Sequence, residues 1–422
     1  AVKVILGENP DLNNPNVDAN VLKTLSLGDV DPADDDVKTI QKSIIARDTI
    51  INKIIEIAHP TEGEATLVVN LEADDPRWLD SETEDGEIRK LIRAIQIIFK
   101  DPEDDINNPN IGPNIVLELT NGTEDTNDDG VVDEHDSDEL GLVLQSTIIS
   151  DSIIKQLREL GSGDNPTLIV DLEADDPRWH DSEERNGEIR NLVLAIEIIL
   201  VKDVDGNIDL DNPTIRPQDE ILRLPDPDID ILMQSIILTR TIVKEVMANE
   251  TLTIPEALKD RNNPDWYNEG DTRGELHKLF AVAAITMDDD STQMSSTKFL
   301  NMSEDDINIV LASLIATETI KTELRGMDKL VIDETNPLFK WEDSFDGDER
   351  TDGELRKLLT SATLLVENEE IKIDKILTLS HVQLDQLCQS RIIVDSTVKE
   401  LETMTAETGS LYKVLYLPDK AE

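Results

Sequence analysis

Apolar residues recur at helical spacing in five stretches of the chain, each about 20 residues long. Their starts are acidic, as at Asp34–Asp36 and Glu304–Asp306, which suits the positive end of a helix dipole. We expect one helix in each stretch and call it helix A. Every copy contains a serine two residues before an isoleucine, at Ser43, Ser146, Ser235, Ser313 and Ser390.

Short apolar segments with alternating polarity flank each helix A, and alternation of this kind is typical of half-buried strands. The segments before helix A are residues 21–27, 115–119, 221–224, 299–302 and 376–379. Those after it are residues 67–71, 168–172, 252–254 and 330–332. We predict strands at both places.

A turn-rich loop follows, and it holds all four tryptophans of the chain: Trp78, Trp179, Trp266 and Trp341. Each loop leads to a Gly-Glu-aliphatic step at Gly86, Gly187, Gly274 and Gly353. That step predicts the start of a second helix, which we call helix B, over residues 86–99, 187–200, 274–287 and 353–366.

The predicted fold class is therefore α+β, a tandem array of about four to five strand-helix-strand-loop-helix repeats with acidic calcium-binding loops. The expected divisions are a partial first repeat over 1–64, then repeats over 65–163, 164–250, 251–327 and 328–422. Residues 1–6 match the end of a helix B, and residues 411–417 resemble a strand after helix A. The ends of the sequence are thus complementary parts of one repeat.

The formal net charge of −53 makes nucleic acid or an anionic membrane surface a poor partner. With 38% hydrophobic residues the chain can still bury a core, and no apolar run is long enough to span a bilayer. Adaptation to salt also explains acidity, but it predicts acid spread diffusely over the surface. Here the acids gather in loops with Asn, Gly and Pro, which favours calcium.

Residues 125–136 alternate oxygen-bearing side chains around Gly130 and resemble the calcium loop of dockerins and the wider EF-hand family. The resemblance covers only these dozen residues, and the last ligand position is Asp, as in dockerins, instead of Glu. It implies calcium ligands at Asp125, Asn127, Asp129, Asp133 and Asp136, together with the Val131 carbonyl. A solvated acidic turn is the alternative.

Further acidic loops extend the calcium prediction. A shorter loop carries Asp203, Asp205 and Asp209, where a calcium site and a plain turn remain equally open. The tryptophan loops concentrate carboxylates whose mutual repulsion a hard cation would relieve. Pairing with Arg77 and Arg178, or a helix-start role for the glutamates, are the alternatives. The candidate ligands there are Asp75, Asp80, Glu87, Asp176, Asp181, Glu188, Asp265, Asn268, Asp271, Glu275, Asp343, Asp348, Asp352 and Glu354.

The sequence shows no clear catalytic pattern. The five histidines occupy different repeat positions, and Cys388 lies beside Leu387 on a predicted helix face, so no zinc or nucleophile pattern emerges. One tryptophan in each repeat is interpreted as a core residue that holds the loop, with sugar stacking as the alternative. We predict that the protein is not an enzyme.

The sequence thus predicts a secreted or cell-surface structural subunit that calcium stabilises. A chain that begins at Ala1 without methionine suits processing of this kind. The complementary ends predict self-assembly head to tail into a fibre or surface layer. The alternative is a calcium-dependent adhesion protein that binds glycans at a cell surface or matrix.

Overall fold

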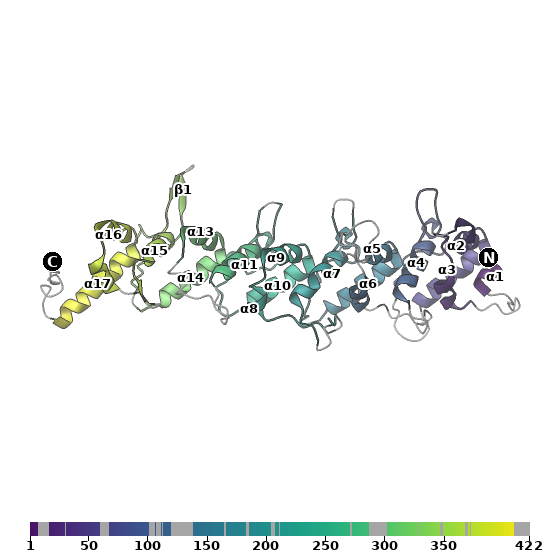
Figure 1. The fold of residues 1–422 in the computed structure, drawn as a ribbon, viewed down its shortest axis with the longest axis horizontal. Coiled ribbons are helices and arrows are strands. Elements are labelled where there is room, and N and C mark those ends of the chain that lie inside the picture. Colours follow the sequence, from purple (N-terminus) through teal and green to yellow (C-terminus); the bar gives the residue numbers. More distant parts are fainter. Residues whose placement is uncertain are drawn as a thin grey trace. The chain divides into compact units, whose positions relative to one another are not determined.

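The structure, a computed structural model, describes most of the chain in two compact units. The described residues are 1–6, 17–29, 31–59, 67–100, 106, 111, 113–119, 138–163, 166–182, 185–203, 207–210, 212–270, 272–286, 302–328, 330–346, 349–367, 370–371 and 373–408. Unit 1 comprises Ala1–Ile215 and Gln234–Thr241, and unit 2 comprises Arg216–Met233 and Ile242–Glu422. Figure 1 shows the order of the elements along the chain.

The predicted α+β fold class is wrong, because the structure is 58% helix and only 3% strand. Within the described residues, the strands form two small antiparallel pairs. They are β1 (Ser344–Asp346) with β2 (Glu349–Thr351), and β3 (Val366–Glu367) with β4 (Glu370–Ile371).

The segments predicted as strands before helix A are largely helical. Residues 21–27, 115–119 and 376–379 overlap the 3-10 helices η1 (Ala19–Thr24), η4 (Pro113–Glu118) and η8 (Ile373–Thr378). Residues 221–224 begin at the end of α8 (Gln218–Ile221), and residues 299–301 lie outside the described part.

The segments after helix A, at 67–71, 168–172, 252–254 and 330–332, have no strand partner among the described residues. A backbone N–H from each of them donates to a hydroxyl on a helix instead, for example from Val68 to Ser152 Oγ at 2.9 Å. Their alternating polarity therefore reflects packing over helices and not a β-ladder.

Each predicted helix A is divided at its serine into a short and a long helix. Ser43 shows why: its backbone is extended (φ −106°, ψ 110°) and its side chain caps the next helix by accepting from the Ala46 N–H. The short helices are α2 (Asp36–Gln41), α5 (Glu139–Leu144), α9 (Asp226–Leu232), α13 (Glu304–Ala312) and α16 (His381–Leu387). The long helices are α3 (Ile44–Ala58), α6 (Thr147–Leu160), α10 (Ile236–Ala248), α14 (Leu314–Gly326) and α17 (Arg391–Thr408).

The predicted B helices are confirmed, three of them to within one residue at each end. They are α4 (Glu87–Ile98), α7 (Glu188–Ile199), α11 (Glu275–Thr286) and the shorter α15 (Glu354–Ala362). Residues 2–6, which match the end of a helix B, form α1 (Val2–Leu6). The remaining 3-10 helices are η2 (Pro32–Asp34), η3 (Pro76–Trp78), η5 (Pro177–Trp179), η6 (Glu256–Leu258) and η7 (Pro264–Trp266).

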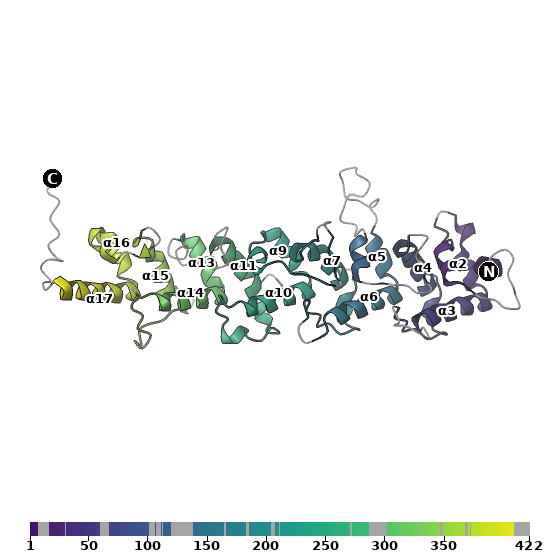
Figure 2. The same ribbon diagram turned by 90° about the horizontal axis from the view of Figure 1, so that it is seen from below.

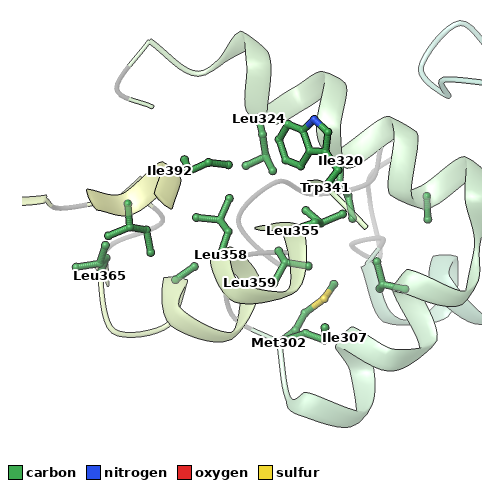
Figure 3. Close-up of a cluster of buried hydrophobic side chains, with 14 of the residues drawn as sticks. Met302, Ile307, Ile320, Leu324, Trp341, Leu355, Leu358, Leu359, Leu365 and Ile392 are labelled. Atoms are coloured by element: carbon green, nitrogen blue, oxygen red, sulfur yellow. The ribbon is translucent and has the colours of Figure 1, made fainter. Parts of the chain in front are cut away.

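Each unit builds its core by packing a helix B against the next pair of helices. In unit 1, α4 packs on α5 and α6, and in unit 2, α11 packs on α13 and α14 and α15 on α16 and α17. Figure 2 shows α2 and α5 in one row and α3 and α6 in another within unit 1. Figure 3 shows the corresponding core of unit 2, where Trp341 lies beside Leu324 and Ile320 of α14.

Candidate functional site

A glutamate at the first position of each helix B binds the start of the next long helix along the chain. Glu87 accepts hydrogen bonds from Ser146 Oγ at 2.6 Å and from the Thr147 and Ile148 N–H groups at 3.2 Å each. Ser146 is the N-cap of α6, so one carboxylate satisfies the cap hydroxyl and two backbone donors at the start of that helix. We call this arrangement the glutamate clamp.

The glutamate clamp occurs four times among the residues that the structure describes. Glu188 accepts from Ser235 Oγ, Ile236 N and Ile237 N at 2.7, 2.8 and 2.9 Å. Glu275 accepts from Ser313 Oγ, Leu314 N and Ile315 N at 2.6, 3.0 and 2.8 Å. Glu354 accepts from Ser390 Oγ and Ile392 N at 2.6 and 2.9 Å.

The clamp glutamates are buried, with exposed fractions between 1% and 5%. Burial raises the pKa of Glu87, Glu188 and Glu275, because the ionised carboxylate loses hydration. Hydrogen bonds from the serine and the helix N–H groups offset part of this rise. Polar groups buried in this way are stable only with their partners in place.

A second bond accompanies each clamp, six residues further along the long helix. The hydroxyl at that position accepts a backbone N–H from the segment that precedes the tryptophan loop. The four bonds run from Val68 to Ser152, Ile169 to Thr241 and Thr253 to Thr319, each at 2.9 Å, and from Val331 to Ser396 at 2.8 Å. A carboxylate and an N–H thus bind within the first two turns of each of these helices.

The first long helix, α3, carries the same residues with an open face. Ser43 caps α3, and Thr49 Oγ1 donates to the Ile45 carbonyl, as Ser152 does to Ile148. Among the described residues no carboxylate accepts from Ser43 and no backbone N–H donates to Thr49. Ile45 is 78% exposed, whereas its counterparts Ile148, Ile237, Ile315 and Ile392 are 0% or 1% exposed.

The glycine before each clamp glutamate is required by a close approach of two backbone segments. A Cβ on Gly86 would lie 2.2 Å from the Leu79 carbonyl carbon, and equivalent clashes of 2.2–2.4 Å occur at Gly187, Gly274 and Gly353. The Gly86 N–H also donates to Asp80 Oδ1 at 2.9 Å. The tryptophan loop is thereby held against the start of helix B.

The acid two residues after the tryptophan also pairs with a basic residue on helix B. Arg89 donates to Asp80 at 2.7 Å and to Asp35, the N-cap of α2, at 2.8 Å. Corresponding pairs join Arg190 to Asp181 and Arg356 to Asp343. In the third loop both members change together, to Asn268 and His277, which lie 3.4 Å apart. The geometry persists there with a neutral amide in place of the carboxylate.

The predicted core role of the tryptophans agrees with their placement. Trp78, Trp179 and Trp266 are fully buried, and their indole N–H groups donate to backbone carbonyls within their own loops. Trp341 is 9% exposed and donates to the Glu334 carboxylate at 3.0 Å. These rings have almost no free face on which a sugar could stack.

The structure gives most of the described candidate calcium ligands of the tryptophan loops protein partners. Asp75 and Asp176 cap short 3-10 helices and bind Arg77 and Arg178. These guanidinium groups lower the pKa of Asp75 and take that of Asp176 to about 2. Asp352 binds Arg350, and Asp265 is exposed. The other described candidates bind the serine, arginine, histidine and backbone N–H partners already named: Asp80, Glu87, Asp181, Glu188, Asn268, Glu275, Asp343 and Glu354.

The remaining candidate ligands divide between described and undescribed residues. Asp203 Oδ1 accepts the Asn207 N–H at 2.9 Å, which closes a turn, and Asp209 accepts from Asn114 and Asn212 at 3.2 Å each. Outside the described residues lie Asp125, Asn127, Asp129, Val131, Asp133, Asp136, Asp205, Asp271 and Asp348. Across the described part of the chain, no group of three or more His, Cys, Asp or Glu side chains is arranged to hold a metal ion.

An open groove of about 730 Å³ lies beside one junction, between α6 and the two segments on either side of it. Asn70 donates to Asp151 at 2.8 Å at this groove, and burial raises the pKa of Asp151. Lys155 and Arg158 also line it, so both signs of charge are present. The groove therefore favours no single charge type of ligand.

The sequence analysis singled out the serines and glutamates of the clamp but did not predict that they bind each other. The serines served to align the repeats, and the glutamates were assigned to calcium or to a helix start. A usable signal was present, since Gly-Glu and Ser-x-Ile alternate along the chain.

None of the helices described is both long and apolar enough to cross a membrane. No family model matches the sequence, and comparison with curated proteins and with solved structures gives no significant match.

Proposed function

We propose that the protein is a structural subunit without enzymatic activity, made of tandem helical repeats that assemble head to tail into a fibre or surface layer. The observation that supports this most directly is the fourfold recurrence of the glutamate clamp. Of the residues that recur in the sequence, Glu and Ser hold each helix B on the next long helix, while Gly and Trp hold the tryptophan loop against helix B. A catalytic site would instead require a constellation that occurs once.

Head-to-tail assembly follows from the way repeats are joined. A junction has two different halves: a segment and helix B on one side, and a long helix on the other. Contacts of this heterologous type give open filaments whenever the rotation between subunits does not close a ring.

We also propose an extracellular setting and stabilisation by calcium, through the dockerin-like loop of residues 125–136. In a chain with a formal net charge of −53, a bound divalent cation would relieve repulsion. The tryptophan-loop carboxylates support the calcium proposal less strongly, because arginines already neutralise several of them.

Sedimentation velocity and negative-stain electron microscopy of the full chain test the assembly. We expect species larger than the monomer whose size grows with protein concentration and which appear as filaments or sheets. A monomer at every concentration, with and without calcium, would overturn the proposal.

Calcium is tested separately by thermal unfolding with calcium and with a chelator. A ligand that binds only the folded state raises the melting temperature by mass action. We expect chelation to lower the melting temperature and elemental analysis to find calcium in the purified protein. An unchanged melting temperature and no bound metal would remove calcium from the proposal and leave the structural role intact.

A further inference from the structure

The groove of about 730 Å³ beside α6 lies within unit 1 and is built like a small-molecule site. Ligand pockets have volumes in this range, and apolar side chains line most of their surface while a few polar groups orient the ligand. The apolar lining here comes from Ile154 on α6 and from Val68 and Val170 on the two flanking segments. Asp151 and Arg158 add charges of opposite sign from the same helix.

Asp151 is the fifth residue after the serine that precedes α6, and its counterparts in the other long helices all form ion pairs. These pairs are Asp48 with Arg47, Arg240 with Asp171, Glu318 with Lys321 and Asp395 with Arg391, at N–O distances of 2.9, 3.0, 2.7 and 3.3 Å. Asp151 instead accepts from the Asn70 amide at 2.8 Å, and no lysine or arginine among the described residues forms an ion pair with it. The described part of the chain therefore leaves the charge of Asp151 without the basic partner that its counterparts have.

The surroundings of Asp151 favour an ammonium group as the missing partner. Burial raises the pKa of Asp151, and the Asn70 hydrogen bond and the positive charge of His180 offset only part of that rise. The bond joins Asn70 Nδ2 to Asp151 Oδ2, so the Oδ1 atom of each side chain can accept from a ligand. An ammonium group has three donors for these acceptors and supplies the positive charge. A bare metal ion needs more ligands, and the described residues contain no group of three or more His, Cys, Asp or Glu side chains arranged to hold one.

Arg158 offers the opposite charge two helical turns further along α6. Seven residues separate it from Asp151, which corresponds to about 10 Å along the helix axis. Arg158 pairs with the exposed carboxylate of Glu173 at 3.3 Å through one terminal nitrogen, and exposed pairs of this kind contribute little stability. Its other N–H groups can bind a second carboxylate. An ammonium and a carboxylate about 10 Å apart occur in an extended tripeptide and in an ω-amino acid of similar length.

We propose that the groove binds a small zwitterion, with its ammonium group on Asp151 and its carboxylate on Arg158. The aliphatic body of the ligand packs over Ile154, between Val68 and Val170. A zwitterion agrees with a lining in which both signs of charge are present. This binding goes beyond the proposed structural role and does not depend on assembly, because every residue that lines the groove lies in unit 1 of a single chain.

Isothermal titration calorimetry of the full chain tests the site with three probes that share one aliphatic body. We expect 8-aminooctanoate to bind at least about tenfold more tightly than octylammonium or octanoate, because each of the latter lacks one charge-assisted contact. Trialanine carries the same charges at a similar spacing on a peptide, so the tighter of the two zwitterions identifies the source of the ligand. The proposal is overturned if neither zwitterion binds saturably at millimolar concentration, or if a probe with a single charge binds as tightly as 8-aminooctanoate.

Variants at the ammonium end test Asp151 directly. Asp151→Asn keeps the shape of the side chain and should weaken 8-aminooctanoate binding by at least about tenfold. It should fold normally, because burial already disfavours the charge that it removes. Asn70→Lys places an ammonium group of the chain itself beside Asp151 and should weaken binding by a similar factor. Asp395→Asn makes the same change at the corresponding position of α17 and should leave binding unchanged.

A variant at the other end separates the two contacts. Arg158→Gln should lower the affinity for 8-aminooctanoate to about that for octylammonium, and it should leave the affinity for octylammonium itself unchanged. Circular dichroism checks that each variant keeps its helix content. Binding of 8-aminooctanoate to Asp151→Asn or to Arg158→Gln as tightly as to wild type overturns the proposal, whether or not the protein assembles.

Discussion

The starts of α3 and α10 carry the same residues in different surroundings. Ser43, Ile45 and Thr49 correspond to Ser235, Ile237 and Thr241, yet only the second set is buried against a helix B and the segment before it. The Glu188 carboxylate and the Ile169 N–H bind the α10 set, whereas within the described residues nothing equivalent binds the α3 set. The difference shows that the burial and the hydrogen bonds of these side chains come from the preceding segment and helix B, and not from their own helix.

The largest expected effect comes from placing a charge at the isoleucine. Ile237→Asp should destabilise the protein by at least about 4 kcal/mol, because it buries an unpaired carboxylate in the core. Ile45→Asp should change the stability of the monomer by no more than about 0.5 kcal/mol. Urea unfolding followed by circular dichroism measures both, and equal effects would contradict the comparison.

Removing the clamp carboxylate should have the next largest effect. Glu188→Ala leaves the Ser235 hydroxyl and two backbone N–H groups buried without an acceptor, at a cost of about 2–4 kcal/mol. Ser43→Ala removes an N-cap that no glutamate among the described residues contacts, at a cost of about 1 kcal/mol. Thermal unfolding ranks the two variants, and a Ser43→Ala effect as large as that of Glu188→Ala would refute the ranking.

The clamp also predicts a pH dependence. Burial raises the folded-state pKa of Glu188 above its unfolded value, so its contribution to stability is fully present below the unfolded pKa and is lost as pH rises through the folded pKa. The stability of wild type relative to Glu188→Gln should therefore fall as the pH rises above the ordinary titration range of a glutamate carboxyl. Melting temperatures of both proteins across this rise in pH measure the trend, and the opposite slope would show that the helix N-terminus outweighs burial.

The smallest contrast concerns the hydroxyl that receives the backbone N–H. Thr241→Val should cost about 1 kcal/mol, because the Ile169 N–H loses its acceptor in a buried site. Thr49→Val should leave the stability of the monomer nearly unchanged, since no described N–H donates to it. Hydrogen exchange at the Ile169 amide is the direct measurement, and unchanged protection there in Thr241→Val would contradict the assignment.

The pairing of distant elements was not readable from spacing. Glu87 lies 59 residues before Ser146, whereas Glu354 lies only 36 residues before Ser390, because the intervening segments differ in length. A constant offset was therefore absent, and the alternation of the two motifs gave their order along the chain but not the contact between them. The strand prediction failed for a related reason. The period-2 pattern at residues 67–71 does not show whether a backbone N–H donates to a carbonyl of another strand or to a side-chain hydroxyl, as Val68 does to Ser152.

The sequence by itself determined the repeated order, the bounds of the B helices and the buried role of the tryptophans. These follow from local signals: helical periodicity, a Gly-Glu helix start and a large apolar side chain beside a turn. Only the tertiary structure decided that Glu87 binds Ser146, that Asp80 binds Arg89 and that the face of α3 is open. A carboxylate can bind calcium, an arginine or a helix N-terminus equally well by composition, and the neighbour that packing brings within about 3 Å selects among them.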